Sequence, residues 1–421
     1  MKYHILLIFS IFTSSLLAQS SWSSLDNAPV NANGTRFDDV FFINSELGWI
    51  ANGANGNVFK TIDGGENWTE VLNEADISAN VYYRNIEFFN ENIGIVTSLS
   101  GLHFKTTDGG ITWSPITFPN NPTAICGLSQ ASETTMYGCG AYNEPAFILK
   151  TTDTGDTWSY TDLSTLANAL VEMLFLNELV GYAAGKNDSG GVILKTTDGG
   201  LTWTQIYNSN IAGEYVWKLQ LVNDNPNVLF GSIESVPMQQ GKVIKSFDAG
   251  ATWESKDCPI RPIQALGFET PQRGWVGGHI GNLYETNDGG DTWTDLGFGT
   301  NANRIFFVGN TAYCSGATIL KLTETLSIPN NNLESRKDLK VVISPMPITD
   351  KLNFSIEYPE TDNAIIELYD HQGRRVEKLT RESLVSKGVK DYSFNFNHAA
   401  GLYFLSIQHN TGRQSIQFIK K

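Results

Sequence analysis

Short apolar runs, each bounded by Gly, Asn, Asp or Ser, follow one another along most of the chain. Runs such as VFFINSE, which end in a polar turn, are followed by Gly-bounded runs such as LGWIANG. Apolar runs of this length with turn residues at both ends are typical of β-strands, and no convincing helical pattern accompanies them. The pattern therefore predicts an all-β protein.

The strands form a repeat that ends each time in the same polar segment. KTTDGGITW (residues 105–113) returns as KTTDGGLTW (residues 195–203), and four related segments end in tryptophan. A period in the forties that contains four short strands is typical of a β-propeller blade. The aspartates of the six segments are spaced 45, 45, 45, 50 and 40 residues apart: Asp63, Asp108, Asp153, Asp198, Asp248 and Asp288.

The two ends of the repeat region complement each other. After the sixth segment the chain offers three more strands but no fourth. The N-terminal stretch SSWSSLDNAP supplies a fourth, because it aligns Trp22 with the tryptophan of each segment. Closing the ring in this way removes open sheet edges. We therefore expect seven blades, although six or eight are also compatible with the sequence.

The repeated segment, S/T-x-D-x-G-x-T-W, resembles the Asp-box, also called the BNR repeat. This repeat occurs in sialidases, sortilin-type receptors and photosystem II assembly-factor-like propellers. The resemblance implies that the box aspartates hold a structural turn away from the ligand face. Their carboxylates can accept backbone N–H groups, the glycines supply positive φ, and the spacing of a calcium loop is absent. We expect these aspartates to be structural.

Both ends of the chain differ from the propeller region, residues 19–326. Residues 1–18 contain a lysine followed by an apolar run and end in Ala18, which is typical of a signal peptide. No other apolar run approaches the length of a membrane span, so we expect no transmembrane segment. Residues 327–339 form a polar linker, and the strands of residues 340–421 predict a small β-sandwich.

The last segment resembles the C-terminal sorting domain of type IX secretion, also called the Por sorting domain. SPMPITDKL, LYDHQGRRV, GLYFLSI and the basic FIKK end carry the likeness, with Met346 where the family usually has Asn. The resemblance implies export through the periplasm by the type IX machinery, after which the tail is removed or attaches the protein to the cell surface. A carbohydrate-binding or Ig-like module is the alternative, since small sandwiches look alike in sequence.

Charge and cysteines restrict the partners and cofactors. The formal charge is −15, and residues 19–339 hold 17 basic and 35 acidic residues. Such an acidic body argues against nucleic acid or an anionic membrane as a partner. No CxxC motif or His cluster suggests a metal, and we expect no cofactor. Cys126 and Cys139 fall near each other in the strand pattern, where a disulfide and two buried thiols are both compatible.

Candidate ligand-binding residues lie just before or early in the first strand of each blade, on the face opposite the boxes. Four of the five arginines of the propeller region are found there, together with several aromatic residues. Arginine forks and aromatic rings suit a protein or glycan ligand. Alternatively, these residues pair with Asp39 or Glu172 around the channel mouth and need no ligand. The candidates are Arg36, Arg84, Tyr83 with its neighbour Tyr82, Tyr215, Trp217, Arg261 and Arg304.

We therefore interpret the sequence as a secreted, non-catalytic binding or scaffold propeller for an extracellular protein or glycan. A sialidase-like glycoside hydrolase is the alternative, with Asp39 and Glu172 as facing carboxylates. Sialidases usually carry an Arg-Ile-Pro motif at the first catalytic arginine. The nearest string, PIRPIQ around Arg261, departs from that motif and comes too late in the chain.

Overall fold

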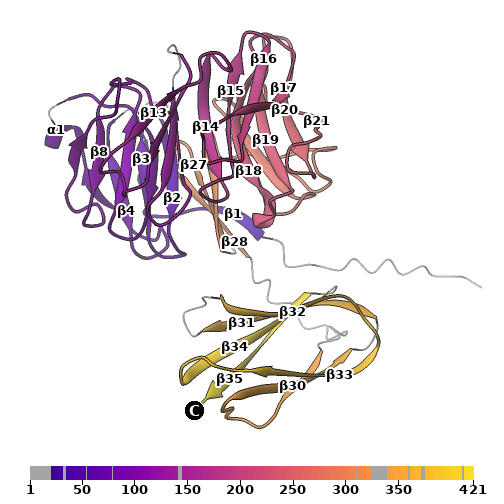
Figure 1. The fold of residues 1–421 in the computed structure, drawn as a ribbon. Helices are drawn as coiled ribbons and strands as arrows, with labels where there is room; N and C mark the ends of the chain where they lie inside the picture. The colour runs from indigo at the N-terminus through magenta and orange to yellow at the C-terminus, as the bar shows by residue number, and fades with distance from the viewer. Residues whose placement is uncertain are drawn as a thin grey trace, which may run out of the picture. The chain divides into compact units, whose positions relative to one another are not determined.

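The computed structural model describes residues 20–31, 35–53, 55–77, 79–140, 145–309, 311–324, 339–358, 361–370, 375–409 and 412–421. The expected signal peptide and all of the expected linker except Leu339 lie outside these residues. The chain divides into two compact units, Met1–Ser327 and Ile328–Lys421 (Figure 1). Within the described ranges the helical elements are the short helix α1 (Glu74–Ile77) and a 3-10 turn at Val222–Asp224. The all-β prediction is confirmed.

The first unit is a ring of four-stranded antiparallel sheets (Figure 1). Six sheets consist of consecutive strands, each ordered from the centre of the ring outward. They are β2–β5 (Phe37–Phe42, Gly48–Asn52, Val58–Thr61, Thr69–Leu72), β6–β9 (Tyr83–Phe88, Gly94–Ser98, His103–Thr106, Ser114–Ile116), β10–β13 (Gly127–Gln130, Met136–Gly140, Phe147–Thr151, Ser159–Asp162), β14–β17 (Ala169–Phe175, Gly181–Asn187, Gly190–Thr196, Thr204–Asn208), β18–β21 (Tyr215–Leu221, Leu229–Glu234, Gly241–Ser246, Glu254–Cys258) and β22–β25 (Ile263–Phe268, Gly274–Gly278, Tyr284–Thr286, Thr294–Asp295).

One further sheet closes the ring with strands from both ends of the unit. Its order is β1-β28-β27-β26, formed by Ser20–Ser24, Ile319–Glu324, Thr311–Ser315 and Arg304–Val308. Trp22 lies opposite Leu322 in the β1–β28 ladder. The first strand of each sheet contacts the first strand of the next, and the cycle is completed where β26 contacts β2. The expected closure by the N-terminal strand is confirmed, and the described residues form seven such sheets.

Each Asp-box is a hydrogen-bonded turn between the third and fourth strands of its sheet. In the box of β16 and β17, Asp198 accepts the Thr202 N–H at 2.9 Å and the Thr202 hydroxyl, and the Thr196 hydroxyl lies 2.8 Å from the same carboxylate. The Thr202 bonds lower the pKa of Asp198 to about 2. The other five box aspartates accept the N–H of the residue four positions later in the same way. Four of them also accept the hydroxyl of that residue, whereas Asp63 accepts the side-chain amide of Asn67. The box carboxylate therefore makes its hydrogen bonds within its own turn.

A lysine from the preceding sheet holds most of these boxes in place. Lys150 Nζ lies 5.2 Å from the ring centre of Tyr137, and both side chains donate to the Gly199 carbonyl of the next box, each at 3.0 Å. We call this arrangement the lysine clasp. The same contact joins four other lysines to the following box: Lys60 to Gly109, Lys195 to Ala249, Lys245 to Gly289 and Lys321 to Gly64.

Two sheets lack the lysine clasp, those that contain Lys105 and Glu285. Lys105 reaches the next box through the Asp156 carboxylate at 2.6 Å. In β24 the corresponding residue is Glu285, and the following sheet has no box to be held. Glu285 pairs instead with Arg273, whose guanidinium lies over Trp275. The clasp thus holds five of the six boxes, and the ion pair of Lys105 with Asp156 holds the sixth.

The second unit is a β-sandwich with its own core. One sheet has the order β29-β30-β33 and the other β32-β31-β34-β35. Alternate side chains such as Leu352, Ile366 and Leu405 are completely buried between them. Apolar side chains on one face of each sheet thus suffice to form this unit. The strands are Lys340–Ile343, Lys351–Tyr358, Asp362–Asp370, Arg375–Val385, Gly388–Asn395, Gly401–His409 and Gly412–Lys420 for β29 to β35.

Replacing the closing tryptophan should destabilise the propeller. Trp22 is buried and packs edge-on against Trp275, with ring centres 5.6 Å apart. We expect Trp22→Ala to lower the free energy of unfolding by about 3–5 kcal/mol, because it leaves a cavity at the last ladder. The exposed neighbour Ser23→Ala should change it by less than about 0.5 kcal/mol. Equal denaturation midpoints for the two variants would show that β1 does not close the ring.

Candidate ligand-binding face

Bulges near the start of the inner strands direct polar side chains toward the centre of the ring. In β2, β6, β14, β18 and β22 the pairing register shifts by one residue. An extra residue of this kind bends the strand and re-aims its side chains. The bulged residues are Asp38, Arg84, Val171, Trp217 and Gln264. The polar contacts of Asp38, Arg84 and Gln264 therefore start from one repeated backbone feature.

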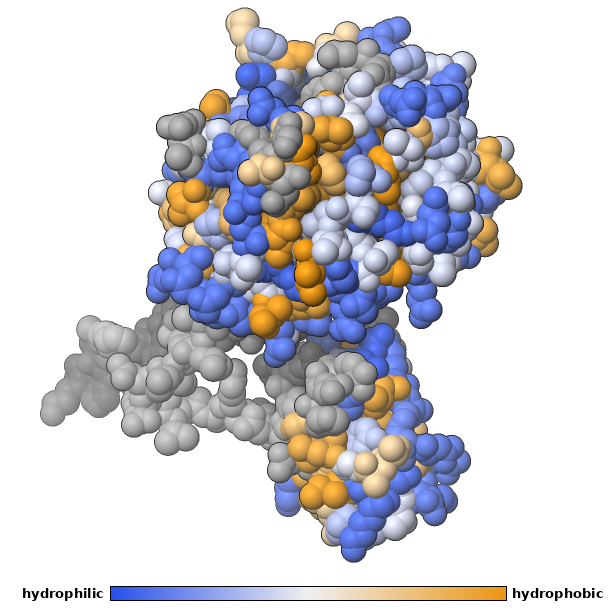
Figure 2. All heavy atoms as spheres, turned by 90° about the vertical axis from the view of Figure 1, so that its left-hand side faces the viewer, coloured by the Kyte–Doolittle hydropathy of each residue, from blue (hydrophilic) through white to orange (hydrophobic). Residues whose placement is uncertain are grey.

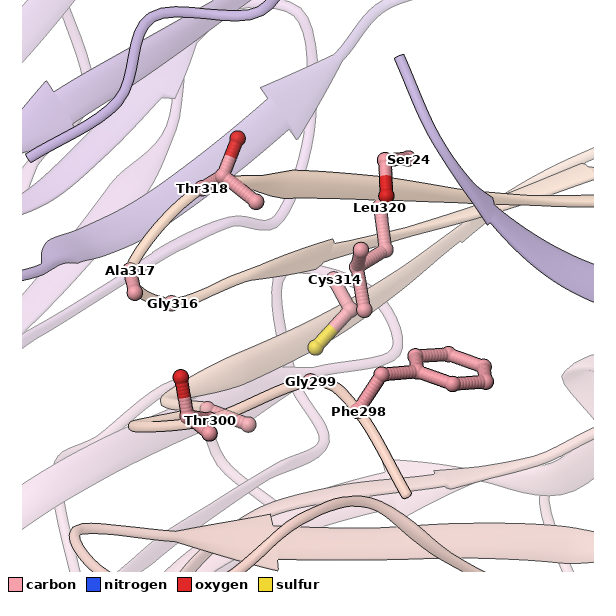
Figure 3. A pocket seen from close by; sticks show the side chains of 10 residues that line it. Ser24, Phe298, Gly299, Thr300, Cys314, Gly316, Ala317, Thr318 and Leu320 are labelled. Carbon is pink, nitrogen blue, oxygen red and sulfur yellow. The ribbon is translucent and has the colours of Figure 1, made fainter. Parts of the chain in front are cut away.

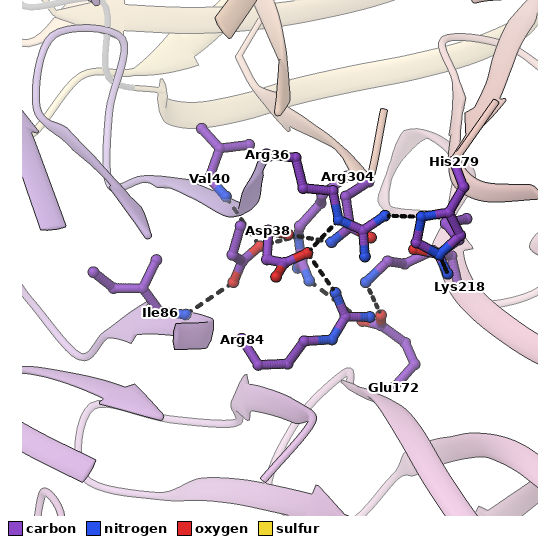
Figure 4. A network of polar contacts seen from close by, with 12 residues as sticks. Arg36, Asp38, Val40, Arg84, Ile86, Glu172, Lys218, His279 and Arg304 are labelled. Atoms are coloured by element: carbon purple, nitrogen blue, oxygen red, sulfur yellow. Dashed lines mark hydrogen bonds and ion pairs between the residues drawn. The ribbon is translucent and has the colours of Figure 1, made fainter. Parts of the chain in front are cut away.

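Asp38 joins two of the expected arginines. Its Oδ1 atom lies 2.6 Å from Arg36 Nε and 3.2 Å from Arg84 Nη1 (Figure 4). Arg36 also donates from Nη1 to His279 Nδ1 at 2.8 Å, and the Gln264 amide lies 2.6 Å from the other ring nitrogen. Asp38, Arg36 and Arg84 are all buried. This group connects three sheets and offers little of its charge to solvent.

Arg304 joins two carboxylates from different sheets. Its Nε atom lies 3.2 Å from Asp39 Oδ1, and its Nη1 atom lies 3.4 Å from Glu172 Oε1 (Figure 4). Lys218 Nζ is 2.8 Å from the second oxygen of Glu172. The Ile86 N–H donates to Asp39 Oδ2 at 2.9 Å, which ties this side chain to the next sheet. Both carboxylates are thus saturated by internal partners.

Burial and neighbouring charges together shift the pKa values of the side chains around Arg304. Burial raises the pKa of Asp39 and lowers that of Lys218, although neighbouring opposite charges oppose both shifts. It also raises the pKa of Glu87 to about 8. Burial would lower the pKa of Arg304 as well, but the charges of Asp39, Glu172 and Glu87 outweigh it and leave that pKa raised. Arg304 is therefore the fixed positive centre around which the carboxylates are arranged.

Aromatic and charged residues stack beside these ion pairs. The rings of Tyr215 and Trp217 are stacked with centres 4.8 Å apart, Lys186 Nζ lies over Tyr215, and the Arg84 guanidinium lies over Trp217. Trp217 Nε1 donates to Glu234 at 2.6 Å. Arg261 approaches Glu234 at 4.0 Å, and its side chain is 41 % exposed. Arg261 is therefore the most accessible of the four expected arginines.

The structure brings all of the expected ligand residues except Tyr83 into these groups. Tyr83 is completely buried and packs against Phe104 between two sheets. Its neighbour Tyr82 lies near Asp38, and burial, assisted by the Asp38 charge, raises the pKa of Tyr82 to about 12. Tyr83 directly precedes the bulge of β6 and lies in the core, whereas Tyr82 lies on the side of Asp38. Sequence reasoning also missed Asp38, Lys186 and Glu234, which lie beside residues that it did select.

The two cysteines of the open disulfide question are buried and are not joined by a disulfide. Cys126 and Cys139, like Cys258 and Cys314, are buried and unbridged. Among the described residues no cluster of His, Cys, Asp and Glu has the arrangement of a metal site. In the same part of the chain no helix has the length and apolar character needed to cross a bilayer.

Comparisons with known proteins agree with this architecture. Residues 14–143 match the family described as Photosynthesis system II assembly factor YCF48, and residues 342–421 match the Secretion system C-terminal sorting domain. The first unit is an Asp-box β-propeller, part of which matches the YCF48 family, and the second unit matches the type IX sorting domain. The chain is therefore exported to the cell surface or secreted. No curated protein matches it in sequence.

Solved structures support the same fold. YCF48 bound to D1 peptide is 22% identical, with a TM-score of 0.55 over 73% of this chain and 98% of that one. PorZ of Porphyromonas gingivalis, an essential bacterial surface component of the type-IX secretion system, is 12% identical, with a TM-score of 0.51 over 92% and 59% of the two chains. An ancestral GH74 enzyme is 14% identical, with a TM-score of 0.54 over 94% and 63%. At these identities the likeness establishes the fold.

Removing the central guanidinium should destabilise the propeller. In Arg304→Met, Asp39 and Glu172 remain buried without their shared partner, which we expect to cost about 3–5 kcal/mol of unfolding free energy. Arg261→Met is the control, since its exposed ion pair is worth less than about 1 kcal/mol. Denaturant titration of both variants measures the difference. Equal stability would mean that the Arg304 ion pairs contribute nothing to the fold.

Proposed function

We propose that this chain is an exported, non-catalytic binding protein. Its propeller recognises a carboxylate-bearing protein or glycan ligand at the channel mouth, and the type IX machinery recognises its C-terminal domain. The observation that carries the proposal is the state of Asp39 and Glu172. Their side chains are 2% and 4% exposed, and both are bound by Arg304. Glycoside hydrolysis needs one carboxylic acid and one carboxylate that reach the sugar and a water, and this pair is enclosed.

Accessible positive charge beside the buried Tyr215–Trp217 stack favours ligand recognition at this face. Arg261 and Lys186 are partly exposed, and they flank the Tyr215–Trp217 stack from two sheets. An exposed guanidinium can bind a carboxylate through two parallel hydrogen bonds. Arg36, Arg84 and Arg304 contribute indirectly by fixing the mouth. YCF48 bound to D1 peptide offers a precedent for a peptide ligand on a propeller of this type.

Two observations favour the alternative function, a glycoside hydrolase. The fold is shared with an ancestral GH74 enzyme, and Arg304 brings Asp39 and Glu172 near each other. Catalysis would require this guanidinium to withdraw and water to enter. An experiment that measures both binding and hydrolysis separates the two functions.

A peptide and glycan array probed with the mature full-length chain tests the proposal. We expect Arg261→Ala to weaken binding of any captured ligand by about tenfold or more, the usual effect of losing a charge-assisted hydrogen bond. Lys256→Ala is the matched control, because it removes a partly exposed cation that pairs with Asp291 in an Asp-box. Undiminished binding by Arg261→Ala would contradict the proposed site. Hydrolysis of an arrayed sugar, lost in Glu172→Gln, would establish the hydrolase instead.

A further inference from the structure

A cavity of about 270 Å³ opens between the last two sheets of the propeller, among loops opposite the Asp-boxes (Figure 3). Three segments form it. They are the end of β1 at Ser24, the loop that connects β25 to β26, and the turn between β27 and β28. Figure 3 shows the side chains of Cys314 and Leu320 between Ser24 and the Phe298–Thr300 segment. None of these residues takes part in the ion pairs of the channel mouth.

Backbone hydrogen bonds fix the shape of this cavity. The Ala317 N–H donates to the Thr300 carbonyl at 3.2 Å, which joins the two loops directly. The carbonyls of Phe298, Gly316 and Ala317 accept N–H groups of other segments at 2.8 to 3.0 Å. A side chain at Gly316 would lie 2.9 Å from the Thr300 carbonyl, so the close approach of the loops requires glycine there. The walls are pre-formed, and four of their carbonyls already have partners.

The lining selects a neutral ligand. None of the ten lining residues carries a charge, and apolar groups of Phe298, Ala302 and Leu320 form much of the wall. Burial raises the pKa of the Cys314 thiol well above its usual range, so this side chain stays neutral. A dry apolar cavity of about 150 Å³ in another protein holds benzene. The larger volume found here therefore accommodates one aromatic side chain.

Exposed apolar side chains extend this surface beyond the cavity. Phe298 is 38% exposed at its edge. Val30 is 75% exposed, and it follows Pro29, whose carbonyl accepts the hydroxyl of the lining residue Thr318. A free ring inside the cavity would leave both side chains in water, whereas a ring carried by a peptide would cover them. The rim thus favours a peptide over a free small molecule.

We propose that this cavity is a binding site for a neutral aromatic side chain presented by a peptide segment of a partner protein. The site contains Ser24 of the closing strand, so it is complete only when β1 occupies its place in the ring. A ligand that contacts β1 and both loops stabilises the closed propeller, since it binds the folded chain alone. The site is independent of Arg261 and of the ligand proposed for the channel mouth.

Capped amino acids test this inference on the mature full-length chain. We expect N-acetyl-L-tryptophanamide to bind one site with a Kd on the order of 1 mM and to raise the melting temperature, whereas N-acetylglycinamide should do neither. Ala317→Trp fills the cavity and should weaken binding at least tenfold. Ala251→Trp, at an exposed position of an Asp-box, is the matched control and should bind as the parent does. Phe298→Ala, which removes a partly exposed wall, provides a second variant if Ala317→Trp fails to fold.

The outcomes separate the alternatives. Saturable binding that is lost in the cavity variants and kept in Ala251→Trp supports the site. Binding of free indole without binding of the capped amino acid overturns the peptide source. No saturable binding of any aromatic probe, or equal binding by Phe298→Ala and the parent chain, overturns the site itself. None of these results depends on whether the peptide and glycan array captures a ligand.

Discussion

The lysine clasp is the contact on which the arrangement of the propeller depends. In each clasp a lysine lies over an aromatic ring of its own sheet and donates to a backbone carbonyl in the box of the next sheet, as Lys150 does with Tyr137 and Gly199. In the box that receives this bond, the aspartate is bound to the backbone and side chains of its own turn. Each sheet therefore fixes the outer turn of its neighbour. The exception at Glu285 occurs where the next sheet is closed by β1 and has no box.

The boxes and the lysine clasps lie on one face of the ring, so the loops of the opposite face can carry residues for recognition. The boxes repeat almost without change, whereas the bulged inner strands carry different side chains in each sheet. Asp38 and Arg304 take up most of the resulting charge within the channel mouth. Arg261 and the cavity near Phe298 remain accessible. The face thus combines an internal ion-pair network for stability with two accessible features of different chemistry, one cationic and one apolar.

Much of this fold could be predicted from local sequence, and much of the site could not. The box spacing and the alignment of Trp22 predicted the sheets and their closure, since each rests on a pattern within one repeat. The carbonyl that a clasp lysine binds lies in the next repeat. The Lys-Thr pair at the start of a box therefore does not indicate, from sequence alone, what its lysine contacts. The sequence named both Tyr82 and Tyr83, and only the fold shows that Tyr83 is buried in the core beside the β6 bulge. Asp38, Asp39 and Glu172 bind three arginines, and the contacts of Arg84 and Arg304 join residues of different sheets that local sequence does not bring together.

The central claim is that the propeller closes on its own and that the C-terminal unit serves export. The most direct measurement compares the location and melting temperature of the full-length chain and a chain without residues 340–421, both expressed in a host with type IX secretion. We expect the truncated propeller to keep the melting temperature of the parent propeller and to accumulate in the periplasm, while the full-length chain reaches the cell surface or the medium. Normal export of the truncated chain would contradict the role of the tail. A propeller that unfolds without the tail would contradict its independent closure.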